Sequence, residues 1–384
     1  MRKANWAWAV LVAGAVLLGG CKNFWAPPAS TTTTTTTTTL NSGYFFILDP
    51  STSEIISYNI VSGVLTKINA YDVPAAPLAI AIAPNKNFLY VSSLSGIFVY
   101  TVSGGVLTKG NNGEVISLDS ATAMAVDSTS SWLIEASGSA GNLYAISVDP
   151  SSGLLTSTTE SAQPVPLTGT AINQVTISPN NQFVFVAAGA NGTYAYSFNA
   201  ASTGNPFASA AYDLIGVKNS SAGTSVSVAV DPSNRLLYVG EVAAVSSGGG
   251  LRAFTIASNG ALAEIAGSPY ASGGTGPYSI LPKSTNDTVY VANWKGTSAG
   301  NITGFSISST NSVYGLTQLS STATTGIRPM AITEDSEENF VLVESAGGSP
   351  YFSAYVFDTT TASQLDLTIT DSTFAGATLA AEQY

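Results

Sequence analysis

Residues 77–110, PLAIAIAPNKNFLYVSSLSGIFVYTVSGGVLTKG, decide the fold predicted for this chain. The segment contains four short runs of apolar or alternating residues, LAIAIA, FLYVSS, GIFVYTV and GVLTK, separated by turns of Gly, Asn and Ser. Short runs rich in β-branched and aromatic residues and bounded by turn formers are typical of β-strands. The segment therefore predicts one four-stranded unit.

The same unit recurs along the chain with a nearly constant period. The position of Pro84 returns five times, in steps of 44, 51, 53, 52 and 52 residues, at Ser128, Pro179, Pro232, Ser284 and Ser336. Each of these positions is followed by a run that matches FLYVSS, namely WLIEA, FVFVA, LLYVG, TVYVA and FVLVE. Four-stranded units with such a period are typical of the blades of a β-propeller.

The two ends of the repeat region are incomplete in complementary ways. Residues 44–68 supply three strands, YFFIL, IISYNI and VLTKI, without an opening strand, whereas residues 377–381, ATLAA, resemble an opening strand with nothing after it. We therefore predict an all-β fold, a seven-bladed β-propeller over residues 43–384, closed by a C-terminal inner strand joined to three N-terminal strands. Closure removes exposed sheet edges. An open solenoid, the alternative, would leave both fragments unpaired.

The N-terminus carries the features of an exported lipoprotein. Arg2 and Lys3 precede an apolar stretch, residues 6–18, that ends in LGGC with the only cysteine of the chain, Cys21. This ending resembles the lipobox of bacterial lipoproteins, which implies a signal peptide over residues 1–20 and a lipid on the Cys21 thiol. An ordinary signal peptide or an anchor helix with a chance cysteine is the alternative.

The segment after Cys21 is predicted to be a tether. Residues 21–42 contain Pro27-Pro28 and nine consecutive threonines, residues 31–39, and no apolar pattern that could build a core. We expect the propeller to be lipid-anchored in the cell envelope. The anchor lies in the outer membrane if the cell has two membranes, and otherwise in the outer face of the cytoplasmic membrane.

Composition limits the chemistry that the chain can perform. The 12 Lys and Arg against 23 Asp and Glu give a net charge of −11, which argues against nucleic acid as a partner. The absence of histidine excludes zinc sites of the His/Cys kind and nucleophiles activated by histidine. A single cysteine excludes an intramolecular disulfide. We expect no cofactor and no metal ion.

The motif P-x-A-I-A-x-x-P, followed by LYV and a G-x-L-T hairpin, resembles the lactonase-type seven-bladed propellers. This 6-phosphogluconolactonase-like family, with its YVTN-repeat relatives, resembles residues 43–384. Members with lactonase activity share a stretch G-P-R-H-L-A-F-H-P before a strand Y-V-x-N-E, in which arginine and histidine stabilise charge and transfer protons. Residues 224–232 here read TSVSVAVDP, with Val226 and Ser227 at those two positions, and only the acid of the following strand is kept, as Glu241.

Candidate site residues lie on loops at one face of the predicted ring. The loops after the second strands and the segments between blades share this face, where propellers bind ligands. The residues on these loops, together with Arg252 at the start of a third strand, are Glu135, Glu241, Asn293, Trp294, Lys295, Arg328, Glu344 and Tyr351.

Glu241 and Arg252 are the candidate catalytic residues, because arginine binds carboxylate and phosphate groups well. They are also ligand-binding candidates, together with Asn293, Trp294 and Arg328. An ion pair between Glu241 and Arg252, eleven positions apart, is the structural alternative. Trp294 could stack on a sugar or aromatic ring, or pack within its loop. The Asp-Pro pairs are interpreted as turns, because they lack the spacing of a calcium loop.

The sequence supports two classes of function. Loss of the arginine and histidine favours a membrane-anchored binding or scaffold module for an envelope protein, peptide or glycan. The resemblance implies the alternative, a lactonase-like hydrolase that acts on sugar lactones.

Overall fold

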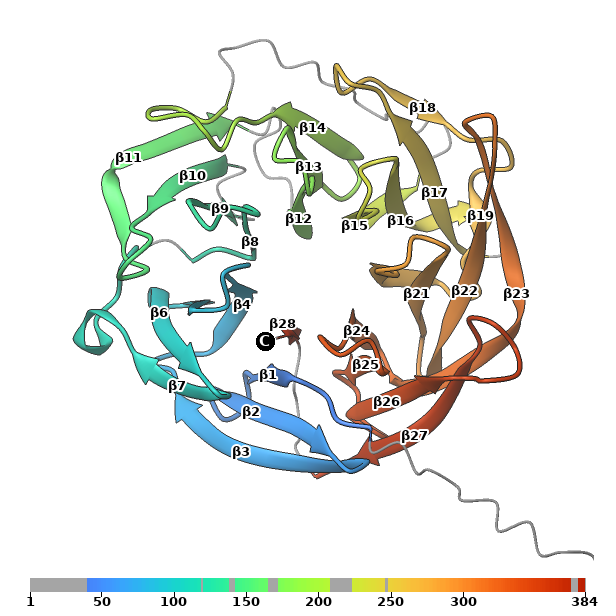
Figure 1. Ribbon diagram of the computed structural model, residues 1–384, viewed down its shortest axis with the longest axis horizontal. Coiled ribbons are helices and arrows are strands. Elements are labelled where there is room, and N and C mark those ends of the chain that lie inside the picture. Colours follow the sequence, from blue (N-terminus) through green and yellow to red (C-terminus); the bar gives the residue numbers. More distant parts are fainter. Residues whose placement is uncertain are drawn as a thin grey trace, which may run out of the picture. The chain divides into compact units, whose positions relative to one another are not determined.

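Seven antiparallel β-sheets are arranged as blades around a central axis in residues 40–384 (Figure 1). The computed structural model describes residues 40–118, 120–137, 142–164, 172–207, 223–245, 248–373 and 379–383. The predicted signal peptide and most of the tether lie outside the described residues. Within the described part, no helix is long and apolar enough to span a bilayer. The predicted all-β seven-bladed propeller is confirmed.

The blades are numbered in chain order. Blade 1 contains β1 (Tyr44–Asp49), β2 (Glu54–Val61), β3 (Val64–Asp72) and the C-terminal β28 (Leu379–Gln383). Blade 2 contains β4 (Pro77–Ile82), β5 (Phe88–Ser93), β6 (Gly96–Ser103) and β7 (Val106–Lys109), followed by the short 3-10 helix η1 (Asn111–Gly113). Blade 3 contains β8 (Ala123–Val126), β9 (Trp132–Ser137), β10 (Asn142–Val148) and β11 (Leu155–Pro164).

Blade 4 shows three strands among the described residues, β12 (Gln174–Ile177), β13 (Phe183–Ala187) and β14 (Thr193–Ser197). Blade 5 contains β15 (Thr224–Val230), β16 (Leu236–Val245), β17 (Gly248–Ile256), β18 (Leu262–Glu264) and the two-residue β19 (Tyr270–Ala271). Blade 6 contains β20 (Gly276–Pro282), β21 (Thr288–Lys295), β22 (Ser298–Thr310) and β23 (Val313–Ile327). Blade 7 contains β24 (Pro329–Glu334), β25 (Phe340–Ser345), β26 (Phe352–Phe357) and β27 (Leu365–Asp371).

Blade 1 combines strands from both ends of the chain. Its order is β28-β1-β2-β3, and β28 pairs antiparallel with β1, with Leu379 opposite Leu48 and Gln383 opposite Phe45. The inner strand of this blade therefore comes from the C-terminal end, while in blade 2 the inner strand is β4. Whether the ring depends on this pairing stays a prediction.

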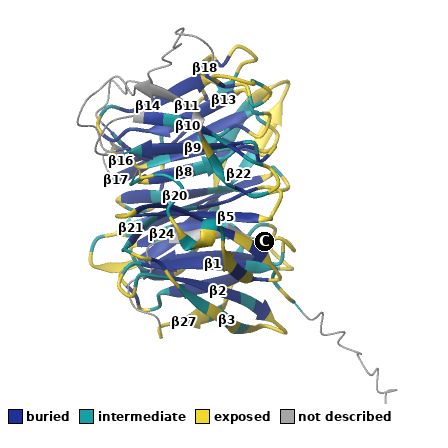
Figure 2. Ribbon diagram, turned by 90° about the vertical axis from the view of Figure 1, so that its left-hand side faces the viewer, coloured by how far each residue is buried: buried dark blue, intermediate teal, exposed yellow. Residues whose placement is uncertain are grey.

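The core lies between the blades, because both faces of each sheet pack against neighbours. Alternate residues of a second strand face opposite neighbours: Val343 belongs to a cluster with blade 6, whereas Leu342 packs with Phe45 and Ile47 of blade 1. Strands near the axis are therefore buried along most of their length, while outer strands such as β3 are largely exposed (Figure 2). This explains why the second strands lack strict polar alternation in the sequence.

The turns after four of the inner strands link their blades to the preceding blade. One turn residue in each of blades 3, 4, 5 and 6 has a positive φ and presents a side-chain oxygen to a backbone N–H of the preceding blade. These four acceptors, with N···O distances of 3.0, 3.1, 3.0 and 3.1 Å, are Ser130, Asn181, Asn234 and Asn286. Asn tolerates the left-handed conformation better than most residues, which suits it to this position.

Asp-Pro pairs close turns, as interpreted from the sequence. Asp231 accepts hydrogen bonds from the backbone N–H groups of Arg235 and Leu236, and its other oxygen pairs with the Arg235 side chain at 2.6 Å. Asp149 accepts the N–H of Ser151 at 2.8 Å.

Candidate functional site

The second strands end at one face of the ring, which we call the upper face. In four blades the residue at this end pairs with the start of the inner strand: Ser93 with Pro77, Glu241 with Ser225, Asn293 with Pro277, and Ser345 with Pro329. Glu241 and Asn293 therefore occupy equivalent positions in their blades. The repeat brings these two candidates to the same level of the ring.

Arg252 on β17 is held between two carboxylates. Its Nε donates to Oε2 of Glu241 at 2.7 Å, and its Nη1 donates to Oε1 of Glu264 on β18 at 2.7 Å. The side chains of Arg252 and Glu241 are 5% and 2% exposed, whereas Glu264 is 35% exposed. The ion pair offered as the structural alternative is therefore present. Glu264 is a partner that sequence reasoning missed, since nothing in the sequence marks its strand as the neighbour of Arg252.

One nitrogen of this guanidinium has no acceptor in the described part of the chain. Nη2 of Arg252 is buried and has no hydrogen-bond partner among the described residues. A buried N–H group without an acceptor costs about 1–3 kcal/mol, so a ligand oxygen beside Nη2 would be stabilised. The carboxylate of Glu241 lies against Gly223, where an added Cβ would come within 2.5 Å of Oε2.

Four inner strands carry a β-bulge at the equivalent position, near the upper face. In β15, Ser225 is opposite Glu241 and Ser227 is opposite Gly240, so Val226 is an extra residue beside the candidate acid. The other bulges lie at matching positions of β4, β20 and β24. We call the four extra residues the bulge ring: Leu78, Val226, Tyr278 and Met330. Bulges re-aim side chains and are over-represented beside active sites.

The two positions at which the resembling lactonases carry arginine and histidine are occupied by neutral residues. Val226 is 9% exposed. Ser227 is buried, and its hydroxyl donates to the carbonyl oxygen of Pro277 in blade 6 at 2.6 Å. Neither residue supplies a positive charge or a base.

Asn293 and Trp294 lie together at the upper end of β21. The buried amide nitrogen of Asn293 donates to the carbonyl oxygens of Ser272 at 2.6 Å and of Val291 at 3.0 Å, which fixes the neighbouring loop. Trp294 is half-buried, and its ring centroid lies 5.9 Å from that of Tyr278 at 49°. Its Nε1 donates to the carbonyl oxygen of Gly296. The pair of rings provides an apolar surface beside the bulge ring.

Arg328 and Lys295 are exposed cations at this end of the molecule. Arg328 has a φ of 58°, in the left-handed region that an arginine seldom adopts, and its carbonyl oxygen accepts the N–H of Ala346 at 3.0 Å.

Two further candidates are partly or fully buried. Glu135 is buried in β9. Tyr351 is half-buried and packs against the apolar cluster between blades 7 and 1.

Glu344 on β25 is a buried acid without a counter-charge. It is 0% exposed, and neither carboxyl oxygen has a hydrogen-bond partner among the described residues. Burial raises the pKa of Glu344 well above its usual range, and the nearby carboxylate of Asp49 in blade 1 raises this pKa further.

The described residues contain no group of three or more His, Cys, Asp or Glu side chains that could hold a metal ion.

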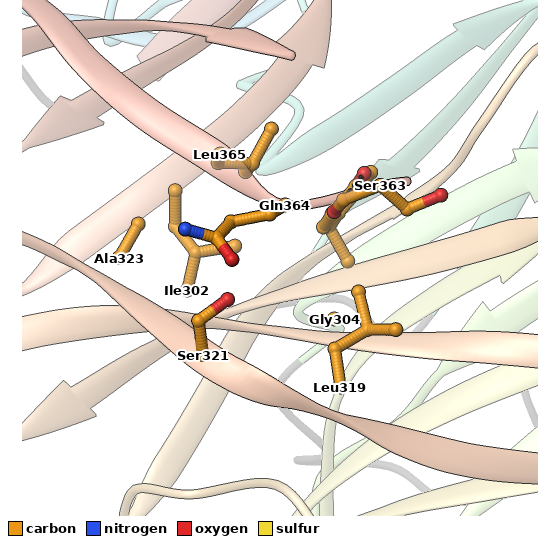
Figure 3. Close-up of a pocket in the computed structure, with 9 residues that line it drawn as sticks. Ile302, Gly304, Leu319, Ser321, Ala323, Ser363, Gln364 and Leu365 are labelled. Carbon is orange, nitrogen blue, oxygen red and sulfur yellow. Dashed lines mark hydrogen bonds between the residues drawn. The ribbon is translucent and has the colours of Figure 1, made fainter. Parts of the chain in front are cut away.

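A separate hollow lies between blades 6 and 7 (Figure 3). Its lining residues come from β21, β22, β23 and the start of β27 and are Tyr290, Ile302, Gly304, Leu319, Ser321, Ala323, Ser363, Gln364 and Leu365. The Tyr290 hydroxyl donates to the carbonyl oxygen of Ser363 at 2.8 Å, which joins the two blades beside this hollow. None of the candidate site residues lines it.

Comparison with known proteins gives a likeness in fold. Neither a known protein family nor a curated protein matches the sequence. Solved structures do match: a putative 6-phosphogluconolactonase from Bacteroides uniformis has a TM-score of 0.70 at 14% identity, over 88% of this chain and 98% of that one. The periplasmic gluconolactonase of Pseudomonas aeruginosa has a TM-score of 0.66 at 15% identity, over 89% and 98%. A protein from Lactobacillus plantarum has 0.68 at 17%, over 89% and 99%.

This chain shares its fold with these structures over nearly their whole length. At 14 to 17% sequence identity, the likeness shows the fold and does not show which residues form a site. The candidate site residues are therefore taken from the local geometry. That geometry offers the Glu241–Arg252 pair, the bulge ring and the Trp294–Tyr278 rings.

Proposed function

We propose that this protein is a lactone hydrolase of the lactonase-propeller type. The observation that carries the proposal is the buried Glu241–Arg252 pair, whose Nη2 has no partner among the described residues. Glu241 is the acid of the strand that follows residues 224–232, one position before the acid of the resembling Y-V-x-N-E pattern. The likeness of the whole ring to structures named as 6-phosphogluconolactonase and gluconolactonase also favours a lactonase over a scaffold role.

The proposed reaction opens the ring with one water molecule. Glu241 accepts a proton from the water as its oxygen attacks the lactone carbonyl carbon, and Arg252 Nη2–H stabilises the oxyanion. The ring C–O bond then breaks, and the proton on Glu241 passes to the departing alkoxide. The product is the hydroxy acid, and no oxidant or reductant is required. A lactone is an activated ester, so one general base and one fixed hydrogen-bond donor are sufficient for its hydrolysis.

Acid release from glucono-δ-lactone by the full-length protein tests this proposal. We expect turnover above the spontaneous rate, and we expect Glu241→Gln to lower kcat about 100-fold, the usual contribution of a general base. Glu264→Gln is the matched control, because Glu264 also contacts Arg252 but lies on the outer strand β18. It should retain activity within a few-fold. Equal losses in both variants would contradict a catalytic role for Glu241.

A binding module for an envelope protein, peptide or glycan is the second candidate. Arg252 already satisfies two carboxylates, and Val226 and Ser227 replace the charged residues of the resembling motif. If no lactone is hydrolysed above the spontaneous rate, this second candidate is favoured. Weaker capture of an envelope partner by Arg252→Ala would then support it.

We further propose that a lipid on Cys21 holds the propeller at a membrane of the cell envelope. The proposal rests on the position of the only cysteine, directly after the apolar stretch and LGG. Residues 22–42 would then separate the propeller from the bilayer surface.

A further inference from the structure

We propose that the bulge ring selects a lactone with an uncharged, apolar substituent in place of a phosphorylated sugar. This inference rests on the proposed function and names its substrate class. It starts from the four residues that the bulges place at one level of the inner strands, Leu78, Val226, Tyr278 and Met330. All four are apolar or aromatic, and none carries a charge.

The bulge ring lies beside the proposed catalytic pair. Val226 is inserted opposite the bond between Gly240 and Glu241. Tyr278 follows Pro277, whose carbonyl oxygen lies 2.5 Å from where a Cβ on Gly240 would be. Two members of the bulge ring therefore lie next to the end of the strand that carries Glu241.

The apolar surface is accessible and held in place. Leu78, Tyr278 and Met330 are half-buried, so each presents part of its side chain to solvent. The ring of Tyr278 lies against Gly276, where an added Cβ would come within 2.7 Å of it, and beside Trp294 on its blade. A fixed apolar surface lowers the entropy lost when a ligand binds.

The charges around the upper face disfavour an anionic substrate. Asp49 and Glu241 are buried acids at the upper ends of second strands, Glu264 adds a second carboxylate beside Arg252, and the chain as a whole carries −11. Arg252 is already paired with two carboxylates. Arg328 is an exposed cation two residues before Met330 and outside the bulge ring, so it is the residue that an anionic substrate would require.

The experiment compares lactones with the full-length protein. We expect kcat/KM for δ-decalactone to exceed that for 6-phosphoglucono-δ-lactone and for glucono-δ-lactone by at least about tenfold. Val226→Thr, which keeps the shape of the side chain, and Met330→Ser should each lower kcat/KM for δ-decalactone several-fold, and by a larger factor than they lower kcat/KM for glucono-δ-lactone. Leu94→Ser is the matched control, because Leu94 is 65% exposed on an upper-face loop outside the bulge ring.

The outcomes separate this inference from the proposed function. Hydrolysis of the phosphorylated or plain sugar lactone at an equal or higher kcat/KM would overturn the inference and leave the lactonase proposal standing. So would a large loss on Arg328→Ala. If no lactone is hydrolysed, the lactonase proposal fails, and calorimetry with 2-heptylcyclopentanone, a ring ketone that cannot be hydrolysed, decides the inference. Binding weakened by Met330→Ser supports an apolar site, and absence of binding overturns it.

Discussion

At the scale of single residues, buried charges in this propeller differ in how they are compensated. Arg252 and Glu241 neutralise one another at 2.7 Å, and a second acid, Glu264, shares the guanidinium. Glu344 has no such partner and faces Asp49. The sequence predicted the first pair, because eleven positions across a hairpin bring the two side chains together. It could not reveal Glu264 or the isolation of Glu344, since both depend on contacts between strands and blades.

The isolation of Glu344 predicts a specific pH dependence. Because its pKa is raised in the folded state, the native protein holds this proton more tightly than the unfolded chain, whose value is near 4.5. The stabilisation is complete below that value and is lost as pH rises through the folded pKa, by at most about 1.4 kcal/mol per pH unit. Glu344→Gln cannot ionise, so its free energy of unfolding should be flatter with pH and higher than the parent's in alkali.

Urea titrations of the parent and of Glu344→Gln between about pH 5 and 9 check this prediction. Asp335, whose pKa burial raises to about 6, is present in both proteins and cancels in the comparison. Glu264→Gln, a change at an acid that is 35% exposed, is the control and should keep the parental slope. A parental slope in Glu344→Gln would mean that Glu344 does not titrate in this range.

Cys21 gives a second prediction at this scale. Cys21→Ser removes the only thiol of the chain, so we expect an unprocessed precursor without lipid. Metabolic labelling with a radioactive fatty acid, followed by electrophoresis, measures both. Label that persists on the variant would exclude Cys21 as the lipid site.

At the scale of elements, the repeat in the sequence predicted most strands because each is a short apolar run between turn residues. It did not reveal the bulges, since Leu78, Val226, Tyr278 and Met330 share neither size nor polarity. It also did not reveal the links between blades made by turn residues with positive φ. Asn181, Asn234 and Asn286 recur at one position, which was an available signal, but their partners lie in another blade.

Asn234 contributes to the link between blades in two ways, through its left-handed backbone conformation and through its side-chain hydrogen bond. Asn234→Gly keeps the favourable left-handed conformation and removes only the acceptor for the N–H of Asn180, so we expect a loss of about 0.5–1 kcal/mol. Asn234→Ala removes the same acceptor but keeps a Cβ at φ 58°, so it should be about 1 kcal/mol less stable than the glycine variant. Urea denaturation of both variants measures the difference. Equal stability of the two would show that the turn relaxes when the side chain is lost.

At the scale of the whole molecule, the fold was predictable because seven similar units must bury their faces against one another. The site was predictable only in part. Glu241 and Arg252 were identified from the resemblance and from the scarcity of arginine. The apolar bulge ring emerges only when inner strands that are far apart in the sequence are brought to one level.

The pairing of β28 with β1 gives the last prediction. Removing residues 375–384 would leave one edge of β1 unpaired and uncover Ile47 and Leu48, which are 0% exposed. We expect a loss of several kcal/mol out of a typical total of about 5–15, seen as a lower Tm or as aggregation. Because Gln383 lies opposite Phe45, the end of β28 is next to the start of β1. Moving residues 375–384 in front of residue 43 through a short glycine linker should therefore rebuild the blade as consecutive hairpins and restore the parental Tm. If the truncated chain melts like the parent, the ring does not depend on this strand. If the truncation destabilises and the permuted chain fails to recover, the tail acts through contacts other than its pairing with β1.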